Sequence, residues 1–99
     1  MAKVIKEGNI LVIEMTDFSI KVTRSKSGWD GSIWFDGKPS IVSLGNVCIA
    51  SLLVDLANKA ANHIREVMIE NVSHEFERYF IEEGYPEEFP SDFKEDEDD

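Results

Sequence analysis

The residues of this chain that are best suited to chemistry are carboxylates, and they gather at its C-terminal end. From Glu82 to Asp99 there are ten acidic residues and one base, Lys94, whereas positions 1–81 hold ten acids and nine bases. The formal charge is therefore −9 at this end and −1 in the remainder, which together make the net −10 of the chain. Charge placed so unevenly indicates an interaction property rather than a requirement of the fold.

Aromatic residues are interleaved with these carboxylates. Tyr85, Phe89 and Phe93 follow one another four apart, while Pro86 and Pro90 favour an extended chain. Such a segment fits a groove with apolar pockets and a basic rim, and it resembles a strand of phosphates with stacking bases. We predict that it binds a basic partner; a merely solubilising end is the alternative. The predicted partner-binding residues are Glu82, Glu83, Tyr85, Glu87, Glu88, Phe89, Asp92, Phe93, Glu95, Asp96, Glu97, Asp98 and Asp99.

The same carboxylates are poorly placed for catalysis, because acid–base chemistry requires a fixed geometry and we expect a mobile tail after Gly84. His63 and His74 lie eleven apart, about 16 Å on one helix, so one metal ion cannot bind both. Cys48 stands in an apolar turn with no base placed to lower its pKa, and we expect a buried structural thiol. The sequence thus predicts a protein that is not an enzyme, with no catalytic residue, metal or cofactor.

A second group of residues could bind single-stranded nucleic acid. Bases interleaved with aromatic rings on a sheet can contact phosphates and stack on bases. The residues concerned are Lys21, Arg24, Lys26, Trp29 and Trp34. Three bases are few, and Asp30 and Asp36 lie beside them, so a solvated hairpin with one or two core tryptophans is the favoured interpretation. Under the alternative, the acidic tail could fold over this patch and compete with nucleic acid for it.

The elements that position these residues begin with an antiparallel meander of four to five strands, over about residues 3–42. Residues 10–15 are apolar on both faces, which is typical of a covered strand, whereas residues 18–24 alternate and are expected to be half-buried. Asp36-Gly37 predicts a two-residue hairpin. Pro39 cannot donate to a sheet hydrogen bond, which puts the last strand at an edge.

The segment from Asn46 to Gly84 predicts a long or broken C-terminal helix, over about residues 46–83, with Ser43 or Asn46 as its N-cap. Residues 47–57 are apolar nearly all round, which indicates burial on more than one side. About 38 helical residues would reach about 57 Å, far beyond a compact body of this size. We therefore predict a break at residues 71–73, with Ser73 capping a second helix that ends at Gly84.

The apolar first half of this helix also suggests a homodimer. Its predicted interface consists of Ile49, Leu53, Leu56 and Ala60. A dimeric structural or chaperone-like protein is therefore a third hypothesis for the function.

The expected protein is α+β: a single domain at residues 1–84, followed by a flexible acidic tail at residues 85–99. No apolar run is long enough to span a bilayer, and we expect a cytoplasmic location. The preferred function is a small acidic inhibitor that engages a basic protein surface as a nucleic-acid mimic. The partner would be a nuclease, polymerase or DNA-binding protein, as for immunity or viral counter-defence proteins. Direct nucleic-acid binding with an autoinhibitory tail is the alternative, and no membrane partner is expected.

Overall fold

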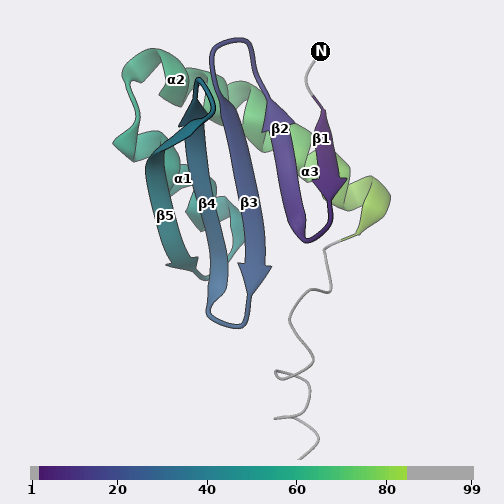
Figure 1. Cartoon of the computed structure of the whole chain (residues 1–99). Coiled ribbons are helices and arrows are strands. Elements are labelled where there is room, and N and C mark those ends of the chain that lie inside the picture. The colour runs from purple at the N-terminus through teal and green to yellow at the C-terminus, as the bar shows by residue number, and fades with distance from the viewer. Residues whose placement is uncertain (1–2, 85–99) are drawn as a thin grey trace, which may run out of the picture.

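A five-stranded antiparallel sheet forms one layer of the protein, in a computed structural model that describes residues 3–84 (Figure 1). Its strands are β1 (Val4–Glu7), β2 (Ile10–Glu14), β3 (Ser19–Ser25), β4 (Gly28–Phe35) and β5 (Lys38–Asn46). They pair in sequence order, β1-β2-β3-β4-β5, so β5 is an edge strand, as the position of Pro39 predicts. The predicted α+β class and the meander are confirmed.

The β4–β5 connection shows how local sequence sets this topology. Asp36 has φ 54° and Gly37 has φ 77°, the two left-handed positions that a tight hairpin with the twist of its strands requires. Beyond this turn β5 continues to Asn46, past the predicted end at residue 42. It does so across two shifts in its register with β4. The sequence signals this extension only weakly, because glycine is uncommon inside strands. Gly45 lies within β5 and has φ 69°.

Helices cover one face of the sheet (Figure 1). They are α1 (Ile49–Lys59), α2 (Asn62–Val67), a π-helical turn η1 (Met68–Val72) and α3 (Ser73–Glu83). Inward-facing residues of the strands meet the apolar face of the helices in one core cluster. Its fully buried large side chains are Ile13, Ile20, Val22, Ile33, Leu52, Leu56, Met68, Val72 and Phe76. Burying a side chain of this size contributes about 1.5–3 kcal/mol, so this cluster holds the two layers together.

Close approach of α1 to the sheet depends on Gly31 in β4. A Cβ atom at this position would stand 3.0 Å from both Cδ atoms of Leu52. Leu52 is itself fully buried, so its side chain occupies the space that a larger residue at position 31 would need.

The predicted helix break at residues 71–73 is wrong. The chain stays helical from Asn62 to Glu83, through the π-helical turn, and Ser73 Oγ donates to the Met68 carbonyl at 3.0 Å instead of capping a new helix. The break lies earlier, at Ala60 and Ala61, which are both extended at ψ 166° and ψ 158°. Two alanines favour helix locally, so the break is set by packing: it turns the chain and lets α1 and α3 lie on the same sheet.

Other helix predictions are corrected or confirmed at the ends. The N-cap of α1 is Cys48, while Ser43 and Asn46 belong to β5. The expected burial of residues 47–57 on several sides is wrong, because Val54 is 57% exposed on the outer side of α1. Gly84 ends α3 as predicted, with φ 81° and its N–H bonded to the Phe80 carbonyl at 2.9 Å. None of the helices in residues 3–84 is long and apolar enough to cross a membrane.

Candidate binding surface

The face of the sheet turned away from the helices, here called the open face, is left uncovered by them (Figure 1). One row of directly paired residues crosses all five strands on this face: Ile5, Val12, Lys21, Ser32 and Val42. Ile5 is 55% and Val42 47% exposed. Val12, between Ile5 and Lys21, is only 6% exposed because its cross-strand neighbours cover it. The open face is therefore a mixed apolar and polar surface.

Charge on the open face is mainly negative. Glu7, Glu14 and Asp30 lie in the two rows that flank the central row. Among the paired positions of β1 to β4 in these three rows, Lys21 is the one basic residue. Asp30 also accepts a hydrogen bond from the Gly45 N–H at 2.7 Å, which ties it to the edge strand. An acidic, partly apolar face suits a cationic partner better than a phosphate backbone.

The predicted nucleic-acid-binding residues are divided between the two faces. Lys21 and Trp34 lie on the open face, where the Lys21 Nζ stands 4.0 Å from the centroid of the Trp34 ring. Trp29 is 4% exposed in the core and meets Phe80 edge-on, with ring centroids 5.9 Å apart. Arg24 lies against Trp29, 5.3 Å from its ring.

The exposed Lys26 lies in the β3–β4 turn, so the five residues do not form one patch. The division follows from the strand period of two, because residues an odd number apart in one strand face opposite sides.

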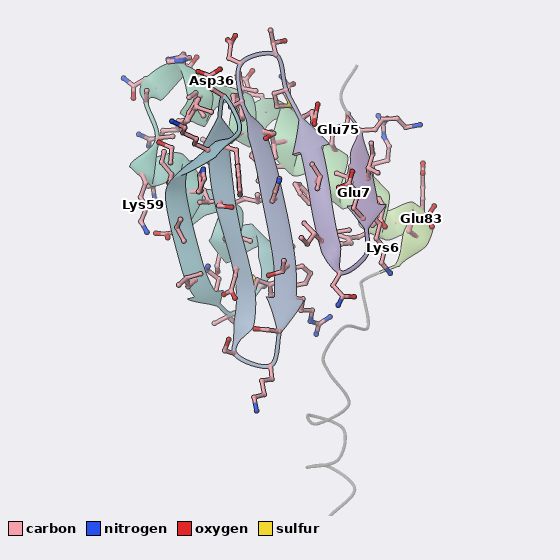
Figure 2. The ribbon with its side chains drawn as sticks, viewed as in Figure 1. Lys6, Glu7, Asp36, Lys59, Glu75 and Glu83 are labelled. Carbon is pink, nitrogen blue, oxygen red and sulfur yellow. The ribbon has the colours of Figure 1, made fainter. Side chains whose placement is uncertain are left out.

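A cavity of about 370 Å³, here called the Trp34 cavity, lies at one end of the open face. The β2–β3 connection and the β4–β5 turn form its rim, and Figure 2 shows Asp36 at this end of the sheet. Its lining residues are Glu14, Met15, Thr16, Asp17, Phe18, Ser19, Lys21, Trp34, Asp36 and Gly37. The sequence predicts only a tight turn at residues 36–37, and this cavity was not predicted. The available signal was an acid next to an aromatic residue in each connection: Asp17 before Phe18, and Asp36 after Phe35.

The indole of Trp34 is held in place within this cavity. Its Nε1 donates to Ser32 Oγ at 2.7 Å, and the Lys21 ammonium lies over its ring. Three exposed carboxylates, those of Glu14, Asp17 and Asp36, surround it. With Lys21 as the one base among its lining residues, the cavity has a formal charge of −2.

The predicted partner-binding segment begins inside the described structure and continues beyond it. Glu82 and Glu83 are exposed at the end of α3, and Figure 2 shows Glu83 on the side of β1. They line a small cavity of about 190 Å³ together with Lys3, Glu75 and Arg78, among others. The remaining residues of the prediction, Tyr85 to Asp99, lie outside the described residues.

The predicted dimer interface coincides with the packing of α1 on its own sheet. Leu56 is fully buried and Leu53 nearly so, while Ile49 is at the margin of the core and Ala60 is partly buried. Ile49 and Leu53 also line an apolar groove of about 320 Å³ between α1 and α3, with Val54, Phe76 and Phe80. The apolar surface that α1 leaves accessible is therefore at Val54 and in this groove.

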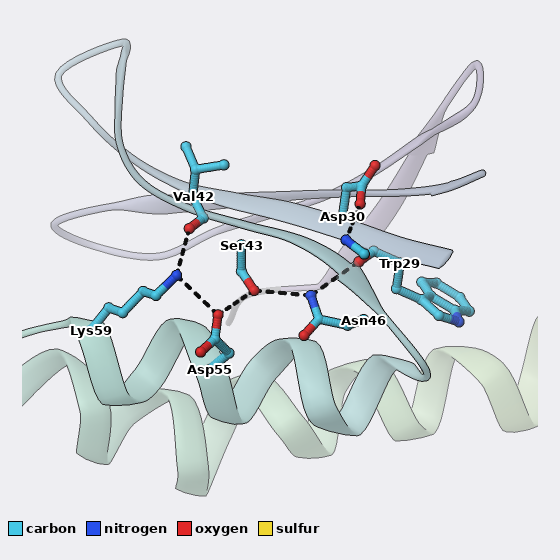
Figure 3. Close-up of polar contacts among 8 residues, drawn as sticks. Trp29, Asp30, Val42, Ser43, Asn46, Asp55 and Lys59 are labelled. Carbon is cyan, nitrogen blue, oxygen red and sulfur yellow. Dashed lines mark hydrogen bonds and ion pairs between the residues drawn. The ribbon is translucent and has the colours of Figure 1, made fainter. Parts of the chain in front are cut away.

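A polar network joins β5 to α1 beneath the open face (Figure 3). The Ser43 hydroxyl donates to Asp55 and accepts from Asn46 Nδ2 at 2.9 Å, while Asn46 also donates to the Trp29 carbonyl at 3.1 Å. Lys59 Nζ bridges Asp55 at 3.1 Å and the Val42 carbonyl at 3.1 Å. The hydrogen bond from Ser43, and then that from Lys59, lower the pKa of the Asp55 carboxyl. This chain of contacts runs from Trp29 and Val42 in the sheet to Asp55 and Lys59 in α1, so it fastens the helix to the sheet.

Cys48 is exposed, which corrects the expected burial of its thiol. It lies at the start of α1, where its Sγ is 3.5 Å from Ser51 Oγ, and hydrogen bonding to Ser51 lowers the pKa of the thiol. His63 and His74 are both exposed, and His74 Nδ1 lies 3.8 Å from Glu77 Oε1. Within residues 3–84, no three His, Cys, Asp or Glu side chains come together as a metal site.

Comparison with protein-family models, with curated protein sequences and with solved structures finds no match to this chain.

Proposed function

We propose that this protein is a small, non-enzymatic binding protein of the cytoplasm that engages a basic surface on another protein. The observation that carries the proposal is the separation of charge along the chain, −9 from Glu82 onward and −1 before it. A body that is almost neutral can fold without self-repulsion, while the acidic end attracts a positively charged partner at long range. The nucleic-acid-binding face of a nuclease, polymerase or DNA-binding protein has the required charge.

The geometry of α3 supports this proposal. The helix ends at Gly84, and Glu82 and Glu83 begin the acidic run at its exposed last turn. The open face of the sheet adds further acids at Glu7, Glu14 and Asp30. Both surfaces therefore favour the same class of partner.

The proposed mechanism divides the work between charge and aromatic rings. The carboxylates between Glu82 and Asp99 would speed the encounter with the partner. Tyr85, Phe89 and Phe93 would enter apolar pockets on it and set the residence time. Occupying the site of a nucleic acid in this way would inhibit the partner, as immunity proteins and virus-encoded counter-defence proteins do.

Direct binding of nucleic acid is the second candidate function, and fewer of its predicted residues than expected share one surface. Of the five predicted residues, Lys21, Arg24, Lys26, Trp29 and Trp34, only Lys21 and Trp34 share the open face. Two residues beside several carboxylates make a weak site for a polyanion.

The test compares three full-length proteins as baits in extracts. The first is the natural chain, and the second carries Gln or Asn at the carboxylates of residues 82–99. The third keeps every charge but carries Tyr85→Ser, Phe89→Ser and Phe93→Ser. We expect the natural chain to retain a basic protein that is released as salt rises from about 0.05 to 0.5 M, where the Debye length becomes short.

Both variants should lose most of this binding. The charge-neutralised variant should associate more slowly, and the variant without the three aromatic rings should dissociate faster. Retention of the same protein by the charge-neutralised variant would refute the proposal. If the variant with serine at positions 85, 89 and 93 binds as well as the natural chain, the aromatic rings are not anchors. If the charge-neutralised variant retains oligonucleotide more strongly than the natural chain does, the protein binds nucleic acid directly and its acidic segment competes for the same site.

A further inference from the structure

The Trp34 cavity combines an aromatic wall with an excess of negative charge. Trp34 and Phe18 supply apolar surface, and the carboxylates of Glu14, Asp17 and Asp36 stand around them. These acids come from three separate places: the end of β2, the β2–β3 connection and the β4–β5 turn. The fold, rather than one run of sequence, therefore gathers them at a single concave site.

The position of Lys21 shows that the face of the Trp34 ring accepts a positive charge. Its ammonium, which comes from the neighbouring strand, lies 4.0 Å from the centre of the Trp34 ring. A cation at this distance is attracted by the electron-rich ring face. One lysine leaves two of the three carboxylates without a compensating charge among the lining residues, so the cavity can take a further cation.

The arrangement of the carboxylates favours an organic cation over a metal ion. No three acidic side chains within the described part of the chain converge closely enough to hold a metal. A guanidinium group, in contrast, is planar, presents five N–H donors in several directions and stacks on aromatic rings. It can therefore contact separate carboxylates and the indole at once.

The size and openness of the cavity fit a side chain that remains attached to a protein. Its volume of about 370 Å³ is at the small end of the usual range for ligand sites. The hydrogen bond from Trp34 Nε1 to Ser32 Oγ at 2.7 Å fixes the indole before a ligand arrives. Lys21 has a flexible stem and a compact charge, so it can move aside without disturbing the strand.

We propose that the Trp34 cavity binds an arginine side chain of a basic protein partner. The inference rests on the proposed function and adds a second point of contact to it. The β2–β3 and β4–β5 connections lie at one end of the sheet, whereas α3 ends beside the edge strand β1 (Figure 1). The cavity and the acidic segment would thus hold one partner at two separated places, which raises affinity through effective concentration.

The experiment uses the full-length protein and two small probes. Nα-acetyl-arginine amide carries the guanidinium, and Nα-acetyl-citrulline amide has nearly the same shape without the charge. We expect the arginine probe to shift the NMR signals of the Trp34 indole N–H and the Gly37 amide in a saturable manner. The Trp29 indole N–H, buried in the core, is the internal reference. Equal shifts with both probes, or no shift at Trp34, would overturn the proposal.

Variants assign the effect to the cavity. Asp36→Asn keeps a residue that tolerates the left-handed φ of this turn, and Asp17→Asn removes a second charge. Each should weaken the arginine probe about two- to fivefold, as for an exposed ion pair. Glu66→Gln, the same change at an exposed site on α2, should leave binding unchanged. Equal weakening by all three would show only non-specific charge attraction and would refute the site.

Failure of this inference can be told apart from failure of the proposed function. The full-length variant with neutralised carboxylates at residues 82–99 keeps the Trp34 cavity. Saturable shifts at Trp34 in this variant would uphold the cavity even if the natural chain captures no basic protein. Loss of the shifts in this variant would show that the acidic segment, and not the cavity, binds the probe.

Discussion

Gly31→Ala should destabilise the protein, because α1 is packed directly against this position. The new Cβ atom would lie 3.0 Å from Leu52 Cδ1 and Cδ2, and 3.3 Å from Cγ. Leu52 is fully buried, and because protein cores are close-packed its side chain has little room to shift. Overpacking of this kind costs about 1–3 kcal/mol, and the lower chain entropy of alanine in the unfolded state offsets about 0.4–1 kcal/mol. We expect a net loss of about 1–2 kcal/mol in the free energy of unfolding.

Urea denaturation of a double-mutant cycle measures this clash. Leu52→Ala alone should cost about 2–5 kcal/mol through the cavity that it leaves. In the Leu52→Ala background the methyl group added at position 31 has room, so Gly31→Ala should become neutral or stabilising there. A coupling energy of about 1 kcal/mol or more is expected for residues in contact. Additive effects of the two substitutions would refute the close packing of α1 on β4.

Three further predictions concern side chains outside the core. Because its hydrogen bonds lower the pKa of Asp55, its contribution to stability should be full above the pKa of the unfolded chain, about 3.9, and disappear as pH falls through the lower folded pKa. The free energies of unfolding of the natural chain and of Asp55→Asn should therefore converge at low pH, and a difference that stays constant with pH would contradict this. In the Ser43→Ala background, the difference at neutral pH should be smaller. Ser73→Ala removes the hydrogen bond to the Met68 carbonyl. It should lower the free energy of unfolding in urea by about 0.5–1.5 kcal/mol, less any gain in helix propensity. A variant more stable than the natural chain would show that this bond is unimportant. Cys48 should react with a thiol reagent as fast in the native protein as in urea, because it is exposed; strong native protection would contradict its position.

The sheet was predictable because its signals are local. Alternation of apolar and polar residues marks the buried face of β3, Asp36-Gly37 forms the tight turn, and Pro39 lies in the edge strand β5. The end of α3 at Gly84 follows from the same kind of rule. Each of these features depends on the conformational preference of one or two residues.

The helix break and the candidate site depend on contacts between distant segments. Ala60 and Ala61 favour helix in isolation, and only the packing of two helices on one sheet makes the chain turn there. The Trp34 cavity likewise requires two turns that are well separated in sequence, at residues 16–17 and 36–37, to meet at one end of the sheet. The division of the predicted nucleic-acid-binding residues has a local cause instead, because Trp29 and Trp34 lie five residues apart in β4 and the strand period of two sends them to opposite faces.

Pairing of each strand with its neighbour in sequence also bears on how the protein folds. Four short turns connect the five strands, so each pairing step closes only a small loop of chain. Small loops cost little entropy, and chains rich in such local contacts cross their folding barrier quickly. We expect the hairpins to form early and the helices to dock later, when the apolar side of the sheet is complete. A newly made chain would then expose its strand edges to other chains only briefly, which protects it from aggregation during synthesis.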